Sequence, residues 1–229
     1  MLNLESKTVF KIRDLGLIRY KDALDVQESE HQIVSSGHKD CIILCQHHHV
    51  YTFGKSANKN NLLISPPFLK SISAEVYDTD RGGDITYHGP GQIVGYPIIN
   101  LRKHGVGVKK YVEILENSII LALADENISA YQITGLTGIW VGKEKEVKRK
   151  IGAIGIRVKQ GVSMHGFALN VSTDLSYFKH IVPCGITDKT VTSIAKENGT
   201  SNIIQFTSRF LQHFNAQWDK ALNLQLLNL

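Results

Sequence analysis

Three long segments of the chain carry apolar residues with helical spacing. They cover residues 18–34, 109–127 and 202–229. An amphipathic helix places apolar side chains three or four positions apart, so this spacing predicts three helices. The first is bounded by the run Ser35-Ser36-Gly37, which is typical of a helix end. In the third, one predicted face carries Phe206, Phe210, Leu211, Phe214 and Trp218.

Short apolar runs between these helices have the length and composition of β-strands. They are residues 41–46, 50–53, 74–77, 93–99, 138–141, 151–158 and 162–171. Strands therefore fill the middle of the chain and helices flank them. This order predicts an α/β (α+β) fold, in which helices pack on a mixed, largely antiparallel sheet.

Length and composition indicate a globular protein with an ordinary core. The chain has 229 residues, of which 42% are hydrophobic, and it contains no repeat and no low-complexity tract. No apolar run approaches the ~18 residues that would cross a bilayer. Residues 1–14 mix charged and apolar positions and lack the apolar core of a signal peptide. We therefore expect a cytoplasmic protein with a single domain over residues 1–229.

The net charge of +5 changes this interpretation little. The basic residues of the chain are dispersed, and exposed aromatic residues do not alternate with them. This pattern argues against a nucleic-acid-binding protein. A mild positive balance suits an acidic protein partner. Such a partner could dock on a cluster of Arg102, Lys103, Lys109 and Lys110, although a solvated helix start explains that cluster equally well.

The most unusual segment is Arg81-Gly-Gly-Asp-Ile-Thr-Tyr-His88-Gly-Pro-Gly-Gln92. It holds four glycines and a proline in twelve residues. Glycines let backbone N–H groups approach a ligand closely. The segment is neither a Walker A loop nor a dinucleotide fingerprint. A long turn would explain the glycines alone, but the polar residues among them favour a binding site.

A second candidate is Lys150, at the head of the predicted strand Lys150-Ile-Gly-Ala-Ile-Gly155. Alternate strand positions share a face, so Lys150 would lie on the same face as Gly152 and Ile154. Desolvation lowers the pKa of a lysine and can make it a base near neutral pH. Taken alone, however, Lys150 fits a strand-end lysine that extends its amine to water. Lys148 and Arg149 are expected in a solvated hairpin loop.

A third candidate is Cys184, which lies between Pro183 and Gly185 and is therefore expected on a tight turn. A free thiol has a pKa near ~8.5, so it needs a base or a cation beside it to react at neutral pH. The candidates for that group are Lys150, His88 and His165. By contrast, Cys41 and Cys45 lie in an apolar run and are interpreted as packing residues.

These segments, together with His165-Gly-Phe-Ala-Leu-Asn170, occur in the order and spacing of lipoyl(octanoyl) transferases, and the resemblance extends over residues 15–214. It implies a fold similar to the biotin/lipoate protein ligase catalytic domain. It also implies octanoyl transfer from octanoyl-acyl carrier protein to a lysine of a lipoyl domain, the first step of protein lipoylation, without ATP or metal. The implied acceptors are the lipoyl domains of 2-oxoacid dehydrogenases and the glycine cleavage H protein.

The resemblance also assigns roles to residues. Cys184 would carry the acyl group as a thioester, and Lys150 would lower the pKa of the thiol or move its proton. Residues that would line the substrate site are Arg81, Gly82, Gly83, Asp84, Ile85, Thr86, Tyr87, His88, Ala153, Ile154, Gly155, Gly166, Phe167 and Ala168. His165 would support them, with its role and that of His88 open between acid–base chemistry and positioning. Small residues such as Gly152 and Ala168 would leave room for an acyl chain.

The chain departs from the family at His47-His-His49, where His49 replaces a proline. Neighbouring strand residues point to opposite faces, so these histidines are not expected to bind one metal ion. Three other functions remain as alternatives: an ATP-dependent lipoate or biotin ligase of the same fold, a thioesterase, and a catalytically silent acyl- or lipoyl-domain-binding protein.

Overall fold

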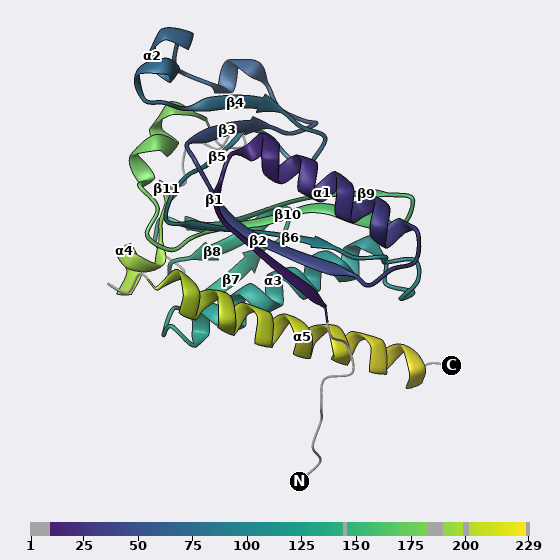
Figure 1. The fold of residues 1–229 in the computed structure, drawn as a ribbon. Helices are drawn as coiled ribbons and strands as arrows, with labels where there is room; N and C mark the ends of the chain where they lie inside the picture. Colours follow the sequence, from purple (N-terminus) through teal and green to yellow (C-terminus); the bar gives the residue numbers. More distant parts are fainter. Residues whose placement is uncertain (1–9, 144–145, 183–189, 199–201, 228–229) are drawn as a thin grey trace.

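The computed structural model describes residues 10–143, 146–182, 190–198 and 202–227. Its centre is a sheet of eight strands, seven of them in the order β1, β2, β6, β10, β9, β8, β7, while β11 pairs with β9 (Figure 1). The strands are β1 (Lys11–Ile18), β2 (Cys41–His47), β6 (Gln92–Ile98), β7 (Ala130–Ile133), β8 (Leu136–Val141), β9 (Arg149–Lys159), β10 (Val162–Asn170) and β11 (Thr190–Val191). The β1–β2 and β11–β9 pairs are parallel and the others are antiparallel. The expected mixed, largely antiparallel sheet is confirmed.

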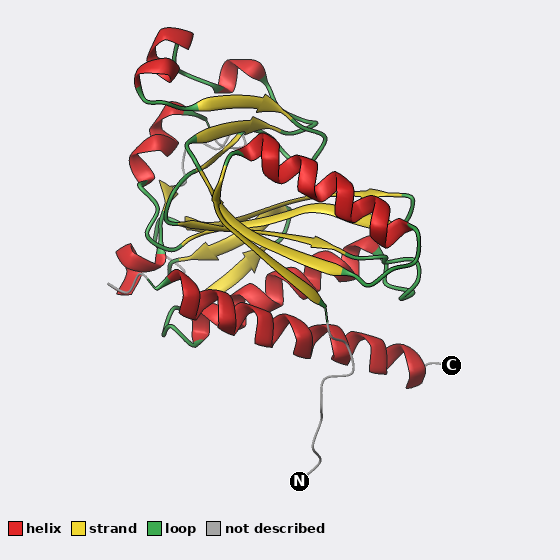
Figure 2. Cartoon of the chain, in the orientation of Figure 1, coloured by secondary structure: helices red, strands yellow, loops and turns green. Residues whose placement is uncertain are grey.

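Helices cover both faces of this sheet. On one face lie α3 (Val108–Ala124) and α5 (Ile203–Leu227), which pack against each other, and on the other lies α1 (Tyr20–Ser35) (Figures 1 and 2). A second sheet of three strands lies above α1 in Figure 1, in the order β4 (Glu75–Asp78), β3 (Val50–Phe53), β5 (Thr86–His88). Short helices complete the fold at α2 (Pro66–Ser71), α4 (Ile194–Asn198), η1 (Lys59–Asn61) and η2 (Leu175–His180).

Strand β2 shows why its sequence is almost entirely apolar. Ile42 and Leu44 pack in the core beneath α3 and α5, while Cys41, Ile43 and Cys45 pack in the layer beneath α1. A strand covered on both faces needs apolar residues at every position. Both cysteines are buried and unpaired, as expected for packing residues, and burial raises the pKa of Cys41 to about 12.

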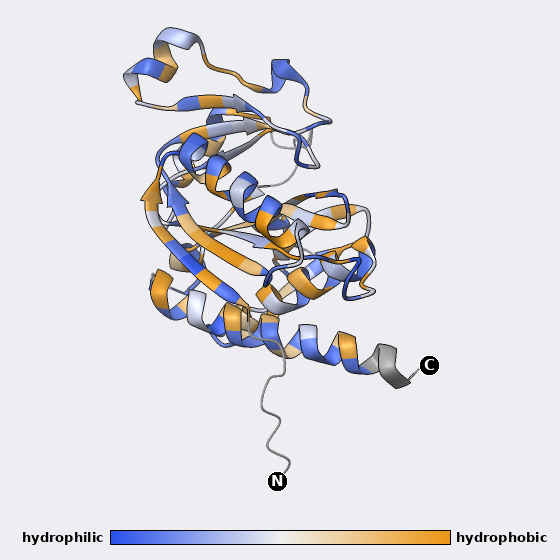
Figure 3. Ribbon diagram, turned by 45° about the vertical axis from the view of Figure 1, so that its right-hand side comes forward, coloured by the Kyte–Doolittle hydropathy of each residue, from blue (hydrophilic) through white to orange (hydrophobic). Residues whose placement is uncertain are grey.

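The aromatic face of α5 closes the core on the other side. Phe206, Phe210, Phe214 and Trp218 are fully buried, and Phe10 packs against the last two. Hydrophobic and hydrophilic segments alternate along this helix (Figure 3). The three helices that periodicity predicts are therefore present, within a few residues of their expected ends. Across the described residues, no helix has the length and apolar character needed to cross a membrane.

Candidate active site

A cavity of about 490 Å³ lies between the main sheet and the glycine-rich segment. Nearly all the predicted site residues that the structure describes line it: Arg81, Gly82, Gly83, Asp84, Ile85, Thr86, His88, Lys150, Ala153, Ile154, Gly155, His165, Gly166, Phe167 and Ala168. Segments separated by more than 60 positions in the sequence thus meet at one site. Cys184 lies outside the described residues.

Tyr87 is not among the lining residues. It occupies the middle of β5, between Thr86 and His88, which both line the cavity. Side chains alternate along a strand, so Tyr87 lies on the other face. There its ring stacks on Tyr177 with centroids 4.9 Å apart, and its hydroxyl bonds His49 Nδ1 at 2.7 Å. Tyr87 therefore joins β5 to η2 and does not line the cavity.

Small residues form one wall of the cavity, along β9 and β10. Ala153 pairs with Ala168, and Gly155 pairs with Gly166. A Cβ atom on Gly166 would lie 2.1 Å from Gly95 O, and one on Gly155 would lie 2.7 Å from Gly82 O. Neither position can hold a side chain, because backbone atoms already occupy the space. The glycines thus allow the glycine-rich loop to lie directly on β9, where Gly82 N donates to Ile156 O at 3.0 Å.

Lys150 reaches the cavity because β9 contains a bulge. Ile139 pairs with Gly152 but Trp140 pairs with Lys150, so Ile151 is the extra residue. Ile151 packs in the same core cluster as Ile154, and the simple alternation predicted from Lys150 onward is therefore wrong at this point. The Lys150 side chain lies beside Gly138, where a Cβ would be 2.5 Å from its Cε, and its Nζ is 5.3 Å from the Trp140 ring centroid.

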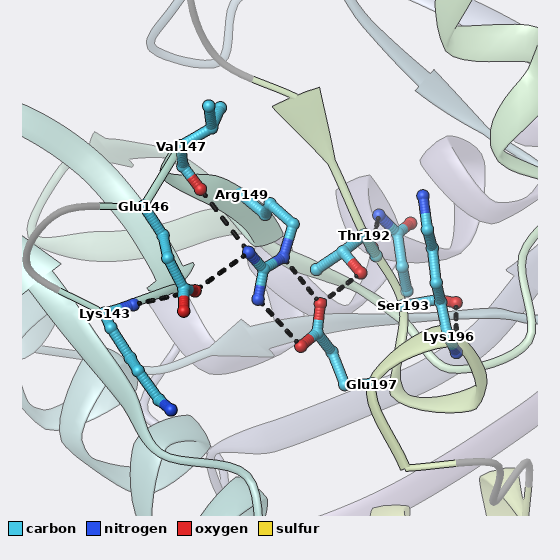
Figure 4. A network of polar contacts seen from close by, with 9 residues as sticks. Lys143, Glu146, Val147, Arg149, Thr192, Ser193, Lys196 and Glu197 are labelled. Atoms are coloured by element: carbon cyan, nitrogen blue, oxygen red, sulfur yellow. Dashed lines mark hydrogen bonds and ion pairs between the residues drawn. The ribbon is translucent and has the colours of Figure 1, made fainter.

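A charged clamp holds the start of β9 (Figure 4). Arg149 donates from Nε to Glu197 Oε1 at 2.9 Å and from Nη2 to Glu197 Oε2 at 3.0 Å. Thr192 donates its hydroxyl to Glu197 at 2.6 Å and its amide N–H to Lys150 O at 2.9 Å. Arg149 therefore belongs to the strand and not to a solvated loop as expected. The clamp fixes both Lys150 and β11, the strand that follows residues 183–189 in the sequence.

A buried chain of hydrogen bonds runs from the glycine-rich segment to this clamp. His88 Nδ1 lies 2.7 Å from Gln92 Oε1, Gln92 donates to Asn170 Oδ1 at 2.9 Å, and Asn170 donates to Thr192 O at 2.9 Å. Because the Gln92 oxygen accepts, His88 Nδ1 carries the proton. Burial lowers the pKa of His88 to about 3, so its ring is neutral at pH 7. This environment suits positioning better than proton exchange.

Arg81 anchors the other end of the glycine-rich segment. Its guanidinium donates to Thr52 O at 2.6 Å and to Asp84 O at 2.8 Å, and it is almost buried. Thr52 Oγ1 also lies 3.5 Å from His88 Nε2. The arginine thus ties the loop to β3 while lining the cavity.

His165 lies at the far end of the cavity from Lys150. It pairs with Ile156, six positions along β9 from Lys150, which is roughly 20 Å at about 3.3 Å per residue. Its Nε2 lies 2.8 Å from Asp80 Oδ1. Burial lowers the pKa of His165 to about 4, so the neutral ring donates to Asp80 from Nε2 and keeps a lone pair on Nδ1. His165 is therefore not adjacent to Lys150.

The three consecutive histidines point apart. His47 Nδ1 donates to Ile18 O at 3.1 Å and its Nε2 accepts from the Tyr96 hydroxyl at 2.7 Å. His49 stacks on Tyr177 with centroids 4.2 Å apart, so the histidine that replaces the family proline packs on η2. No group of three or more His, Cys, Asp or Glu residues could hold a metal ion within the part of the chain that the structure describes.

The structure places Arg102, one residue of the basic cluster, at the turn between β9 and β10. Arg102 packs against Gly161, at the turn between β9 and β10, and its amide bonds Gly161 O. This turn is at the opposite end of β9 from Lys150, roughly 30 Å away at about 3.3 Å per residue. A partner docked there would not be next to Lys150.

Comparison with known proteins decides the family. A family model described as the lipoyl protein ligase A/B catalytic domain matches residues 19–215. The chain belongs to this family. Curated relatives include the octanoyltransferase of Cytophaga hutchinsonii, 46% identical over 226 residues that cover 91% of this chain and 92% of the relative. Another, from Flavobacterium psychrophilum, is 42% identical over 228 residues that cover 93% and 98%. The resemblance inferred from the motifs is confirmed.

Solved structures of lipoate and biotin protein ligases share the fold at much lower identity. Lipoate-protein ligase A bound with ATP aligns with a TM-score of 0.74 and 13% identity, over 96% of this chain and 94% of that chain. Biotin protein ligase from Aquifex aeolicus aligns with a TM-score of 0.52 and 10% identity, over 94% and 72%. At such identities the similarity shows the fold alone, which confirms the ligase-like fold expected from the motifs.

Proposed function

We propose that this member of the lipoyl protein ligase A/B family is an octanoyltransferase of protein lipoylation, which moves an octanoyl group from a carrier protein to a lysine of a lipoyl domain. Lys150 meets the glycine-rich segment and the small-residue wall of β9 and β10 at one cavity, and this observation carries the proposal. The names of the curated relatives, octanoyltransferases that match over nine-tenths of the chain, agree with it.

The cavity supplies what an acyl chain needs. Its wall consists of Ala153, Gly155, Gly166 and Ala168, which leave an open row along the strands. Burying the six methylenes of an octanoyl group would contribute roughly 5 kcal/mol, at about 0.8 kcal/mol for each. Backbone N–H groups of the glycine-rich segment are suited to hold a thioester oxygen as it gains negative charge.

In the proposed reaction Cys184 is the nucleophile and the acyl group moves twice. The thiolate attacks the carrier thioester, so that acyl-Cys184 forms and the carrier thiol leaves. The amine of the target lysine then attacks acyl-Cys184, which yields an amide and restores the thiol. Lys150 either accepts protons in these steps or, as a cation, stabilises the thiolate. A thioester donor makes ATP unnecessary, because amide formation from a thioester is downhill.

A transfer assay tests this function. The purified protein is incubated with a lipoyl domain and either octanoyl-carrier protein alone or free octanoate with ATP, and the mass of the lipoyl domain is measured. We expect an octanoyl amide only from the carrier protein, and none from Cys184→Ser. Product from free octanoate with ATP would instead identify a ligase. Release of octanoate without an amide would identify a thioesterase, and no reaction with either donor would leave a binding protein.

A further inference from the structure

A second hollow of about 310 Å³ lies beyond the far end of the acyl cavity. Leu24 and Glu28 of α1 line it, together with Asp78, Thr79, Asp80, Arg157, Met164 and His165. Among the described residues, His165 is the one that lines both this hollow and the cavity. His165 therefore lies at the boundary of the two cavities.

The row of small residues leads toward this boundary. From Ala153 and Ala168 it passes to Gly155 and Gly166, and the next pair on that face is Arg157 with Met164, in the second hollow. Met164 and Ala168 pack in the same layer beneath α1, which confirms that they share a face.

The backbone conformation of His165 is uncommon. Its φ is +54°, in the left-handed region that only a few per cent of residues other than glycine adopt, with histidine, asparagine and aspartate more frequent there than the rest. The other non-glycine residues with positive φ in the described ranges, Ser73, Asn127 and Gln160, are exposed, whereas His165 is buried. Its Nδ1 is buried without a hydrogen-bond partner. Backbone strain and an unsatisfied polar atom in one buried residue are typical of a functional position.

Neighbouring groups hold the ring across the groove. Asp80 binds Nε2 and is itself paired with Arg157, while Gln27 Oε1 accepts the His165 amide at 3.0 Å. A chain that starts near Lys150 and follows the small residues runs toward this ring, because Gly155 pairs with Gly166, the residue next to His165.

We propose that His165 is the stop that limits acyl-chain length, closing the groove of small residues before it opens into the second hollow. The inference rests on the proposed octanoyl transfer, whose cavity it completes. An acyl chain longer than the groove meets the ring in the parent protein. When the ring is removed, the additional methylenes enter the hollow and contact Met164 and Leu24. Each methylene that becomes buried against these two apolar side chains should favour the longer substrate by up to about fourfold.

The test is a competition between two donors. His165→Gly removes the ring and accepts the positive φ without strain. Equal amounts of octanoyl- and dodecanoyl-carrier protein are offered with a lipoyl domain, and mass spectrometry gives the ratio of the two products. That ratio reports the ratio of kcat/KM values. We expect His165→Gly to raise the ratio of dodecanoyl to octanoyl product at least about tenfold over that of the parent protein, since burial of two methylenes already suffices.

Gln160→Gly is the matched control. Gln160 has a φ of +55°, close to that of His165, but it is exposed at the turn between β9 and β10. The Gln160→Gly substitution should relieve the same backbone strain and leave the ratio of the two products unchanged. His165→Asn, which keeps a smaller polar side chain in a backbone conformation that asparagine tolerates, should give an intermediate ratio.

The outcomes separate the inference from the proposed function. A folded His165→Gly protein with the parental product ratio would overturn the chain-length stop. If circular dichroism shows that this variant does not fold, His165→Asn decides, and a parental ratio there has the same meaning. Failure of the parent protein to transfer either acyl group would instead refute the proposed function, before any variant is compared.

Discussion

The clamp at the start of β9 makes a quantitative prediction for Glu197→Gln. Glu197 accepts two hydrogen bonds from Arg149 and one from Thr192, and the exposed fractions of the Glu197 and Arg149 side chains are 19% and 27%. Glutamine retains one oxygen but turns its amide N–H group toward Arg149, another donor. The variant therefore loses the charge and at least one hydrogen bond of the pair.

The expected loss is about 1–2 kcal/mol in the free energy of unfolding. Hydrogen bonds to charged groups contribute about 1.5–3 kcal/mol, and partial exposure of both side chains reduces this figure. The hydrogen bond from Arg149 lowers the pKa of Glu197 below its ordinary value of 4.5. The contribution is thus complete above pH 4.5 and is lost as the pH falls through the lowered pKa. The variant and the parent should become equally stable in acid.

Urea unfolding at pH 7 measures this difference, and Glu146→Gln is its control. Glu146 also contacts Arg149, but at 3.5 Å and with 45% of its side chain exposed, so its replacement should leave the free energy of unfolding nearly unchanged. Hydrogen exchange gives a local readout, because the Thr192 amide that donates to Lys150 O should exchange faster only in Glu197→Gln. If both variants have the same free energy of unfolding and the same exchange rate at the Thr192 amide, the clamp does not hold Lys150.

Three further predictions concern the cavity and its buried groups. Lys150→Arg keeps the charge but cannot accept a proton near pH 7. If Lys150 is a base, kcat should fall by about 10²-fold or more, and a full rate would contradict that role. Burial lowers the pKa of His47 to about 4 and that of His88 to about 3, whereas the unfolded chain binds these protons below pH 6.5. Stability should therefore decline as the pH falls below 6.5, by about 2 kcal/mol per histidine at pH 5, and equal urea midpoints at pH 7 and pH 5 would refute this. Gly166→Ala brings a Cβ to 2.1 Å from Gly95 O and should destabilise by about 1–3 kcal/mol, so an unchanged melting temperature would show that the wall is not tightly packed.

Elements with strong periodicity were predictable from the sequence because burial follows their pattern directly. Helix α5 presents a row of aromatic residues to the core. Strand β2 is apolar on both of its faces, because helices cover both. Strands β1 and β5 were not predicted. Strand β1 has no fully buried position, and β5 lies within the glycine-rich segment, where turn residues obscure it.

The site could be predicted as far as its local motifs extend. Glycines and charged residues in unusual runs indicated Arg81, Lys150 and their neighbours, and the fold brings them together. Glu197 and Asp80 were not identified, because each is an ordinary acidic residue whose role depends on a partner 48 or 77–85 positions away. The bulge at Ile151 was also missed, since it arises from pairing with β8 and not from the sequence of β9.

The covalent step is the central claim, and the acyl-enzyme tests it most directly. The purified protein is mixed with octanoyl-carrier protein, without ATP or lipoyl domain, and intact mass is followed by peptide mapping. We predict one octanoyl group, on the peptide that contains Cys184, and its loss when a lipoyl domain is added. A folded protein that gains no octanoyl group from a competent donor, or gains one elsewhere, would contradict transfer through Cys184.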